Sequence, residues 1–113
     1  METLSASTPL PIACNLSADE LQARHGEVEA LFAAASGVRE LLDGYDFAFP
    51  ADAQAAHALL DFIVEERACC PFFTFTLTFA APHDAIWLAL RGGEGVKDFV
   101  RGSFLTVTSV RPE

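Results

Sequence analysis

The sequence predicts an α+β fold, a two-layer sandwich in which helices cover an antiparallel sheet. Three patterns support this prediction. Residues 17–20 (SADE) form a capping box, which is typical of a helix start. Asp43-Gly44 lies between two apolar runs and indicates a β-hairpin. Residues 73–79 (FTFTLTF) alternate strictly, which is the period-two pattern of a half-buried strand.

The first half of the chain is expected to form a strand, a helix and a hairpin. A short strand over residues 10–15 precedes a helix that starts at Ser17 and closes at Ser36-Gly37, because glycine commonly follows a helix end. The runs 38–42 and 45–50 then supply the two strands of the hairpin.

A second helix is expected next, with Ala51-Asp52 in its first turn and Pro71 as its stop. A residue before proline is disfavoured in helical geometry, so Cys70 is expected at or just past the helix end. The resulting order is β-α-β-β-α-β-β-α, with about four to five strands, two main helices and a short third helix. The remaining elements are expected at residues 73–79 (strand), 82–84 (turn), 86–90 (strand), after 92–95 (short helix) and 104–110 (edge strand or loose tail).

The length and composition indicate one folded domain. The 113 residues, 12.2 kDa, are expected to divide into a flexible leader (1–9) and a single α+β domain (10–113). With 51% hydrophobic and 20% charged residues, the composition is not that of a disordered chain. Three cysteines are too few, and odd in number, for a disulfide scaffold.

The charge of the chain limits its partners. Sixteen acidic residues against seven basic ones give a net charge of -9. Binding to nucleic acid and to anionic lipid relies on Lys and Arg near phosphate, so neither a nucleic-acid nor a membrane partner is expected. No signal peptide is recognisable, and unpaired cysteines without an export signal indicate a cytoplasmic protein.

The most informative stretch lies at the end of the second helix. If Leu59, Leu60 and Ile63 set the direction of the apolar stripe, Cys70 falls on that stripe. Glu66 and Arg67 then fall on its two flanks, where a charged group is costly unless it is paired. We expect Glu66 to pair with Arg67 or to complete the coordination of a bound ion.

One interpretation of this stretch is a site for a soft metal or metalloid ion, of the Zn, Hg or As type. Cys14, Cys69 and Cys70 would supply three thiolates, which select soft or borderline ions. Glu66 or His25 is the nearest candidate for a fourth ligand, and Arg67 would favour the thiolate forms. Helical neighbours point about 100° apart, so Cys69 and Cys70 can bind one ion only if the last turn is unwound.

Two other interpretations stay open. The cysteines are simply packed in a non-catalytic interaction or dimerisation module, since cysteine is often buried as a small hydrophobe; a homodimer is the candidate assembly. Alternatively the chain is a thiol redox protein, although a helix C-terminus disfavours thiolate. A disulfide from Cys14 to Cys69 or Cys70 is geometrically easier than one between the two neighbours. No catalytic constellation follows from the spacing, so a binding role is expected rather than an enzymatic one.

The run Glu66-Arg67-Ala68-Cys69-Cys70-Pro71-Phe72, with Cys14 upstream of the first helix, resembles a group of small bacterial proteins with an E-R-x-C-C-P-F signature and no established activity. The resemblance covers most of residues 12–104. It implies that Cys14, Glu66, Arg67, Cys69 and Cys70 act together, in a heavy-metal or stress context. The phenylalanines after the proline are expected to pack in the core: Phe72, Phe73, Phe75 and Phe79.

Overall fold

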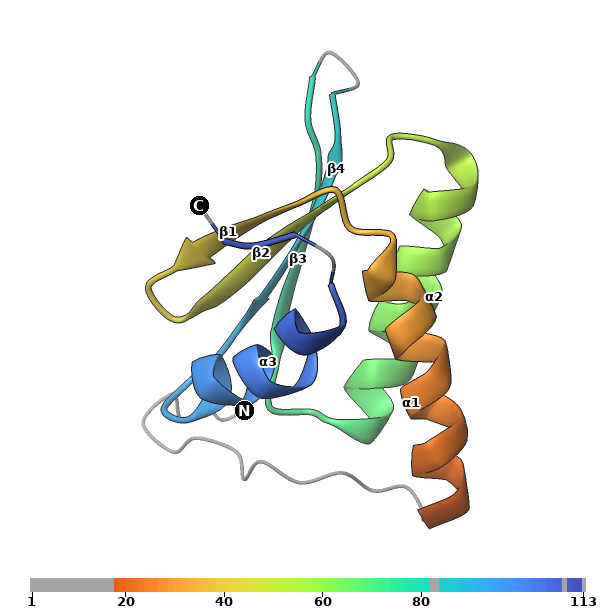
Figure 1. Cartoon of the computed structure of the whole chain (residues 1–113), viewed down its shortest axis with the longest axis vertical. Helices are drawn as coiled ribbons and strands as arrows, with labels where there is room; N and C mark the ends of the chain where they lie inside the picture. The colour runs from red at the N-terminus through yellow and green to blue at the C-terminus, as the bar shows by residue number, and fades with distance from the viewer. Residues whose placement is uncertain (1–17, 82–83, 109, 113) are drawn as a thin grey trace, which may run out of the picture.

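Three α-helices and a four-stranded antiparallel sheet make up the described part of this computed structural model, as the sequence predicts (Figure 1). It describes residues 18–81, 84–108 and 110–112, with the backbone alone for 18–22. The elements are α1 (Ala18–Ala33), β1 (Gly37–Leu41), β2 (Gly44–Phe49), α2 (Ala53–Cys69), β3 (Thr74–Phe79), β4 (Ile86–Arg91), α3 (Val96–Ser103) and the 3₁₀ turn η1 (Leu105–Val107).

Several element ends differ from those predicted. α1 ends at Ala33, and Gly37 is the first residue of β1 rather than the end of the helix. Asp52 precedes α2 as its N-cap, where its carboxylate accepts a hydrogen bond from the Ala55 amide at 2.8 Å. The predicted leader, the strand over 10–15, Ser17 and most of the turn at 82–84 lie outside the described residues.

Of the two forms expected for residues 104–110, an edge strand or a loose tail, the edge strand is wrong. This stretch carries η1, and the nearest β contact is a single parallel bridge between Val38 and Pro112. Alternating apolar residues do not distinguish a strand from a short turn that packs one side on a core. Phe104 is buried there as the C-cap of α3.

The strand order β1-β2-β4-β3 leaves β1 and β3 as the two edges of the sheet. All pairs are antiparallel, and the register places Val38, Phe47, Leu88 and Leu77 in one row across the sheet. Because side chains alternate between faces, this row and its neighbours two residues away form the face that packs on the helices.

The core lies between that face and the helices. Phe32 of α1 is fully buried, and its ring lies 4.9 Å from that of Phe47 in the sheet and 5.2 Å from that of Phe62 in α2. The distance from Phe32 to Phe104 is 4.8 Å. Aromatic rings at these separations combine large apolar burial with favourable edge-on geometry, so Phe32 joins all the layers.

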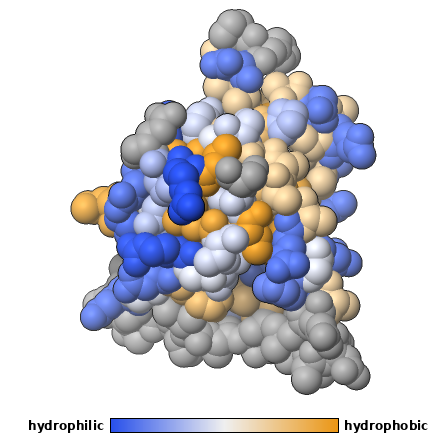
Figure 2. All heavy atoms as spheres, viewed as in Figure 1, coloured by the Kyte–Doolittle hydropathy of each residue, from blue (hydrophilic) through white to orange (hydrophobic). Residues whose placement is uncertain are grey.

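The surface mixes hydrophilic and apolar residues: over the helices, pale apolar residues are interrupted by hydrophilic ones (Figure 2). Among the described residues, none of the helices combines the length and apolarity that crossing a membrane requires.

Candidate cysteine site at the end of helix α2

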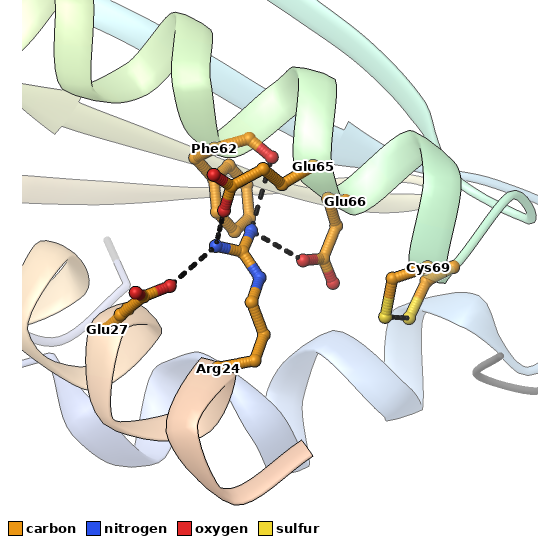
Figure 3. Close-up of polar contacts among 7 residues, drawn as sticks. Arg24, Glu27, Phe62, Glu65, Glu66 and Cys69 are labelled. Carbon is orange, nitrogen blue, oxygen red and sulfur yellow. Dashed lines mark hydrogen bonds and ion pairs between the residues drawn. The ribbon is translucent and has the colours of Figure 1, made fainter. Parts of the chain in front are cut away.

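The end of α2 brings two sulfur atoms together. Cys69 is the last helical residue, and Cys70 has left the helix with φ −132° and ψ 79°, just before Pro71. The Cys70 amide still donates to the carbonyl oxygen of Glu66 at 2.6 Å, which closes the final turn. In this conformation the two Sγ atoms lie 3.3 Å apart (Figure 3). The last turn is therefore not unwound, and the departure of Cys70 alone from helical geometry brings the two sulfurs together.

The two cysteines differ in chemical state. Both are buried, each about 5% exposed. Cys69 is disulfide-bonded, whereas Cys70 is a free thiol. The free thiol thus lies against a sulfur that is already oxidised.

Glu66 is the buried acid of the site. It lies four residues before Cys70, on the inward face of α2, and its carboxylate accepts a hydrogen bond from the Cys70 thiol. Burial raises the pKa of Cys70 to about 12, with a further contribution from the neighbouring Glu66 charge. The positive charge of Arg24 acts in the opposite direction and only in part offsets the increase. At neutral pH Cys70 is therefore protonated.

Arg24 of α1 is the basic partner of Glu66. Its guanidinium group donates to the Glu66 carboxylate at 3.0 Å and to the Phe62 carbonyl oxygen at 3.3 Å (Figure 3). It also pairs with Glu65 and with Glu27, both on the exposed side of the cluster. Its Nε is buried and has no hydrogen-bond partner within the described residues.

The predicted pairing of Glu66 with Arg67 is wrong. Arg67 is exposed, and Arg24 occupies the position beside Glu66. His25 is also exposed, and its Nε2 lies 3.0 Å from a carboxylate oxygen of Glu29 on the same helix. The structure thus brings Glu66, Cys69 and Cys70 together, while His25 and Arg67 face solvent.

The direction assumed for the α2 stripe explains this error. The buried residues of α2 are Leu59, Phe62, Glu66 and Cys69, whereas Leu60 is 51% exposed. Including Leu60 rotates the expected stripe towards Arg67. Arg24 lies on α1, and the pattern of α2 does not point to it. Its position four residues before buried Val28 places it on the inward face of α1, and this helical spacing is the signal that could have identified it.

Cys14 lies outside the described residues, and within the described ones no group of three His, Cys, Asp or Glu side chains could hold a metal ion. Any such site at the end of α2 therefore requires a ligand from elsewhere. Comparison with protein families, curated proteins and solved structures found no match for the chain.

Proposed function

We propose that this protein captures a soft metal or metalloid ion through the thiolates of Cys69 and Cys70, with Cys14 as the third sulfur. The supporting observation is the 3.3 Å separation of the first two sulfurs. Two thiolates bound at about 2.3 Å to one tetrahedral ion stand about 3.8 Å apart, so a displacement of about half an ångström converts the pair into a chelate.

Cys14 is our assignment for the third sulfur. The chain has three cysteines, Cys70 is free, and Cys69 is disulfide-bonded. Two cellular thiols reduce the Cys69 disulfide by exchange: they supply the two electrons and two protons, leave as a disulfide of their own, and all three cysteines are then thiols. This is the state expected in a reducing cytoplasm, where we place the protein.

The surroundings favour a soft ion of low coordination number. Three thiolates suit Hg(II), As(III) or Cu(I), whereas a structural zinc ion takes four ligands, and Cys69 and Cys70 are both buried. The Glu66 carboxylate already accepts hydrogen bonds from Arg24 and from the Cys70 thiol. In our proposal Glu66 therefore positions the thiol and is not the fourth ligand.

The thiol redox interpretation has less support. A nucleophilic cysteine needs a lowered pKa, and the pKa of Cys70 is raised, at the negative end of a helix. The interpretation of simply packed cysteines is the alternative that an experiment must exclude.

The test is metal uptake by protein purified with a phosphine reductant and freed of added metal. Hg(II), As(III) and Zn(II) are titrated separately, with thiolate absorption in the ultraviolet and the bound metal measured after desalting. We expect one equivalent of Hg(II) or As(III) in the wild type. Each of Cys14→Ser, Cys69→Ser and Cys70→Ser should weaken binding at least about tenfold.

Arg67→Ala and His25→Ala are the matched controls, because both side chains are exposed and lie outside the cluster. They should bind as the wild type does. Equal and negligible uptake by the wild type and by a variant with all three cysteines replaced would overturn the proposal in favour of packed cysteines. Unchanged binding in Cys14→Ser would overturn the assignment of the third sulfur.

A further inference from the structure

The two edges of the sheet are protected to different degrees. β1 carries the charged pair Arg39-Glu40, and the C-terminal segment bridges to it between Val38 and Pro112. β3, at the opposite edge, has the sequence TFTLTF, with no charge, no proline and no bulge in its register. Natural sheets use charges, prolines, bulges or covering segments to prevent edge pairing, and within the described residues β3 has none of these features.

The outward backbone groups of β3 can be assigned from its register. The Ala80 amide donates to the Ala85 carbonyl oxygen at 3.4 Å, and antiparallel ladders repeat every two residues. The residues of β3 bonded to β4 are therefore those of even number. The N–H and C=O groups of Phe75, Leu77 and Phe79 face outward, and no described residue bonds to them.

Apolar side chains border the same edge. Phe79 is 64% exposed, contrary to the prediction that it lies in the core. Ala56 of α2 lines a common pocket with Phe79, so this flank of α2 lies over β3. Leu60 and Val64 continue that flank at helical spacing and are 51% and 62% exposed.

Four large hydrophobic residues are exposed in the described part of the chain, and three of them, Phe79, Leu60 and Val64, lie along the open edge. We call the surface formed by β3, Leu60 and Val64 the β3 strip. The fourth is Leu42, in the turn between β1 and β2.

Charge does not oppose a second copy at this strip, although it opposes contact between two copies elsewhere. The chain has a net charge of -9, so two copies repel each other over most of their surface. The β3 strand places no charged group opposite another copy. An antiparallel edge is also self-complementary, since a two-fold axis pairs it with itself.

We propose that the protein forms a homodimer in which β3 pairs with β3 of a second copy, about a two-fold axis at Leu77. Since the outward groups belong to odd-numbered residues, Leu77 faces Leu77 of the other copy, and Phe75 faces Phe79. This register forms about six backbone hydrogen bonds. It also covers the exposed Phe79 ring with an aromatic cross-strand partner and pairs Thr76 with Thr78 on the other face.

The test is the molecular mass in solution, by sedimentation equilibrium under reducing conditions, so that intermolecular disulfides do not contribute. The wild type should have twice the 12.2 kDa chain mass at about 100 µM and dissociate on dilution. Phe79→Lys should raise the dimer dissociation constant at least about tenfold, because it places a charge in the apolar contact.

Leu77→Pro gives a second, independent variant. It removes an outward N–H and leaves the hydrogen bonds to β4 in place, a position where an edge strand tolerates proline. Far-UV circular dichroism shows whether this variant is folded. Leu42→Lys is the matched control, with the same added charge at a residue that is 95% exposed and away from the strip. A wild type that stays monomeric at about 1 mM overturns the proposal. The proposal is also overturned if Phe79→Lys leaves the dimer dissociation constant unchanged, or if Leu42→Lys raises it as much as Phe79→Lys does.

Discussion

The Arg24–Glu66 pair provides the most quantitative test of the site. Both side chains are largely buried, whereas the other carboxylates on Arg24, Glu65 and Glu27, are more than half exposed. In Arg24→Met the buried Glu66 carboxylate loses its counter-ion. Removing one partner of a buried pair costs about 3–5 kcal/mol, and the exposed pairs add no more than about 1 kcal/mol each. We expect the free energy of unfolding to fall by about 4 kcal/mol, a large part of the stability of a small domain.

A pair of double-mutant cycles isolates this interaction. Unfolding in urea is followed by far-UV circular dichroism and by the fluorescence of Trp87, under reducing conditions. The coupling energy between Arg24→Met and Glu66→Gln should exceed about 2 kcal/mol, and that between Arg24→Met and Glu65→Gln should stay below about 1 kcal/mol. Replacing both Arg24 and Glu66 by Met should recover most of the lost stability, because no buried charge then remains unpaired.

Two results would refute this reasoning. One is a loss below about 1 kcal/mol in Arg24→Met, which would mean that Glu66 is hydrated or neutral in the folded protein. The other is equal coupling of Arg24 to Glu66 and Glu65, which would mean that burial does not separate the two pairs.

Four further predictions concern Cys70, Asp52 and Gly44. Alkylation of Cys70 in the unreduced protein should accelerate with pH well above pH 9, because burial and Glu66 raise the pKa of this thiol to about 12; a plateau by pH 9 would contradict this. The unfolded thiol has a pKa near 8.5, so the folded state holds this proton more tightly and the free energy of unfolding should fall between about pH 8.5 and pH 12. Asp52→Ala should lower the free energy of unfolding in urea by about 1 kcal/mol through loss of the α2 N-cap, whereas no change would show that the cap adds nothing. Gly44→Ala should prevent folding or cost at least about 3 kcal/mol, since its Cβ would lie 1.9 Å from the Leu90 carbonyl oxygen; a native circular dichroism spectrum with unchanged stability would disprove it.

The fold was largely predictable because its strongest signals are local. The alternation over 73–79 and the Asp43-Gly44 turn depend on a few adjacent residues, and both gave the correct elements to within a residue or two. For residues 104–110 the sequence left an edge strand and a loose tail open, because the alternating pattern reports only one buried side, which a strand and η1 share. Tertiary contacts, not the local pattern, decide between the two.

The site was predictable only in part. Pro71 correctly indicated that Cys70 leaves the helix, because the effect of proline on its neighbour is a local steric one. The partner of Glu66 was not predictable in the same way, since Arg24 and Glu66 are 42 residues apart and meet only through packing of α1 on α2. Leu60 was also counted as a core residue, and this rotated the expected apolar stripe of α2 towards Arg67.

The C-terminal contact on β1 has a consequence for the growth of a stack of subunits by strand addition. Growth by strand addition needs two available edges on every subunit, one for each neighbour. Here Pro112, which has no backbone N–H, lies against Val38 at one edge. A strand that adds at β1 would have to displace this contact, whereas no described residue bonds to the outward groups of β3.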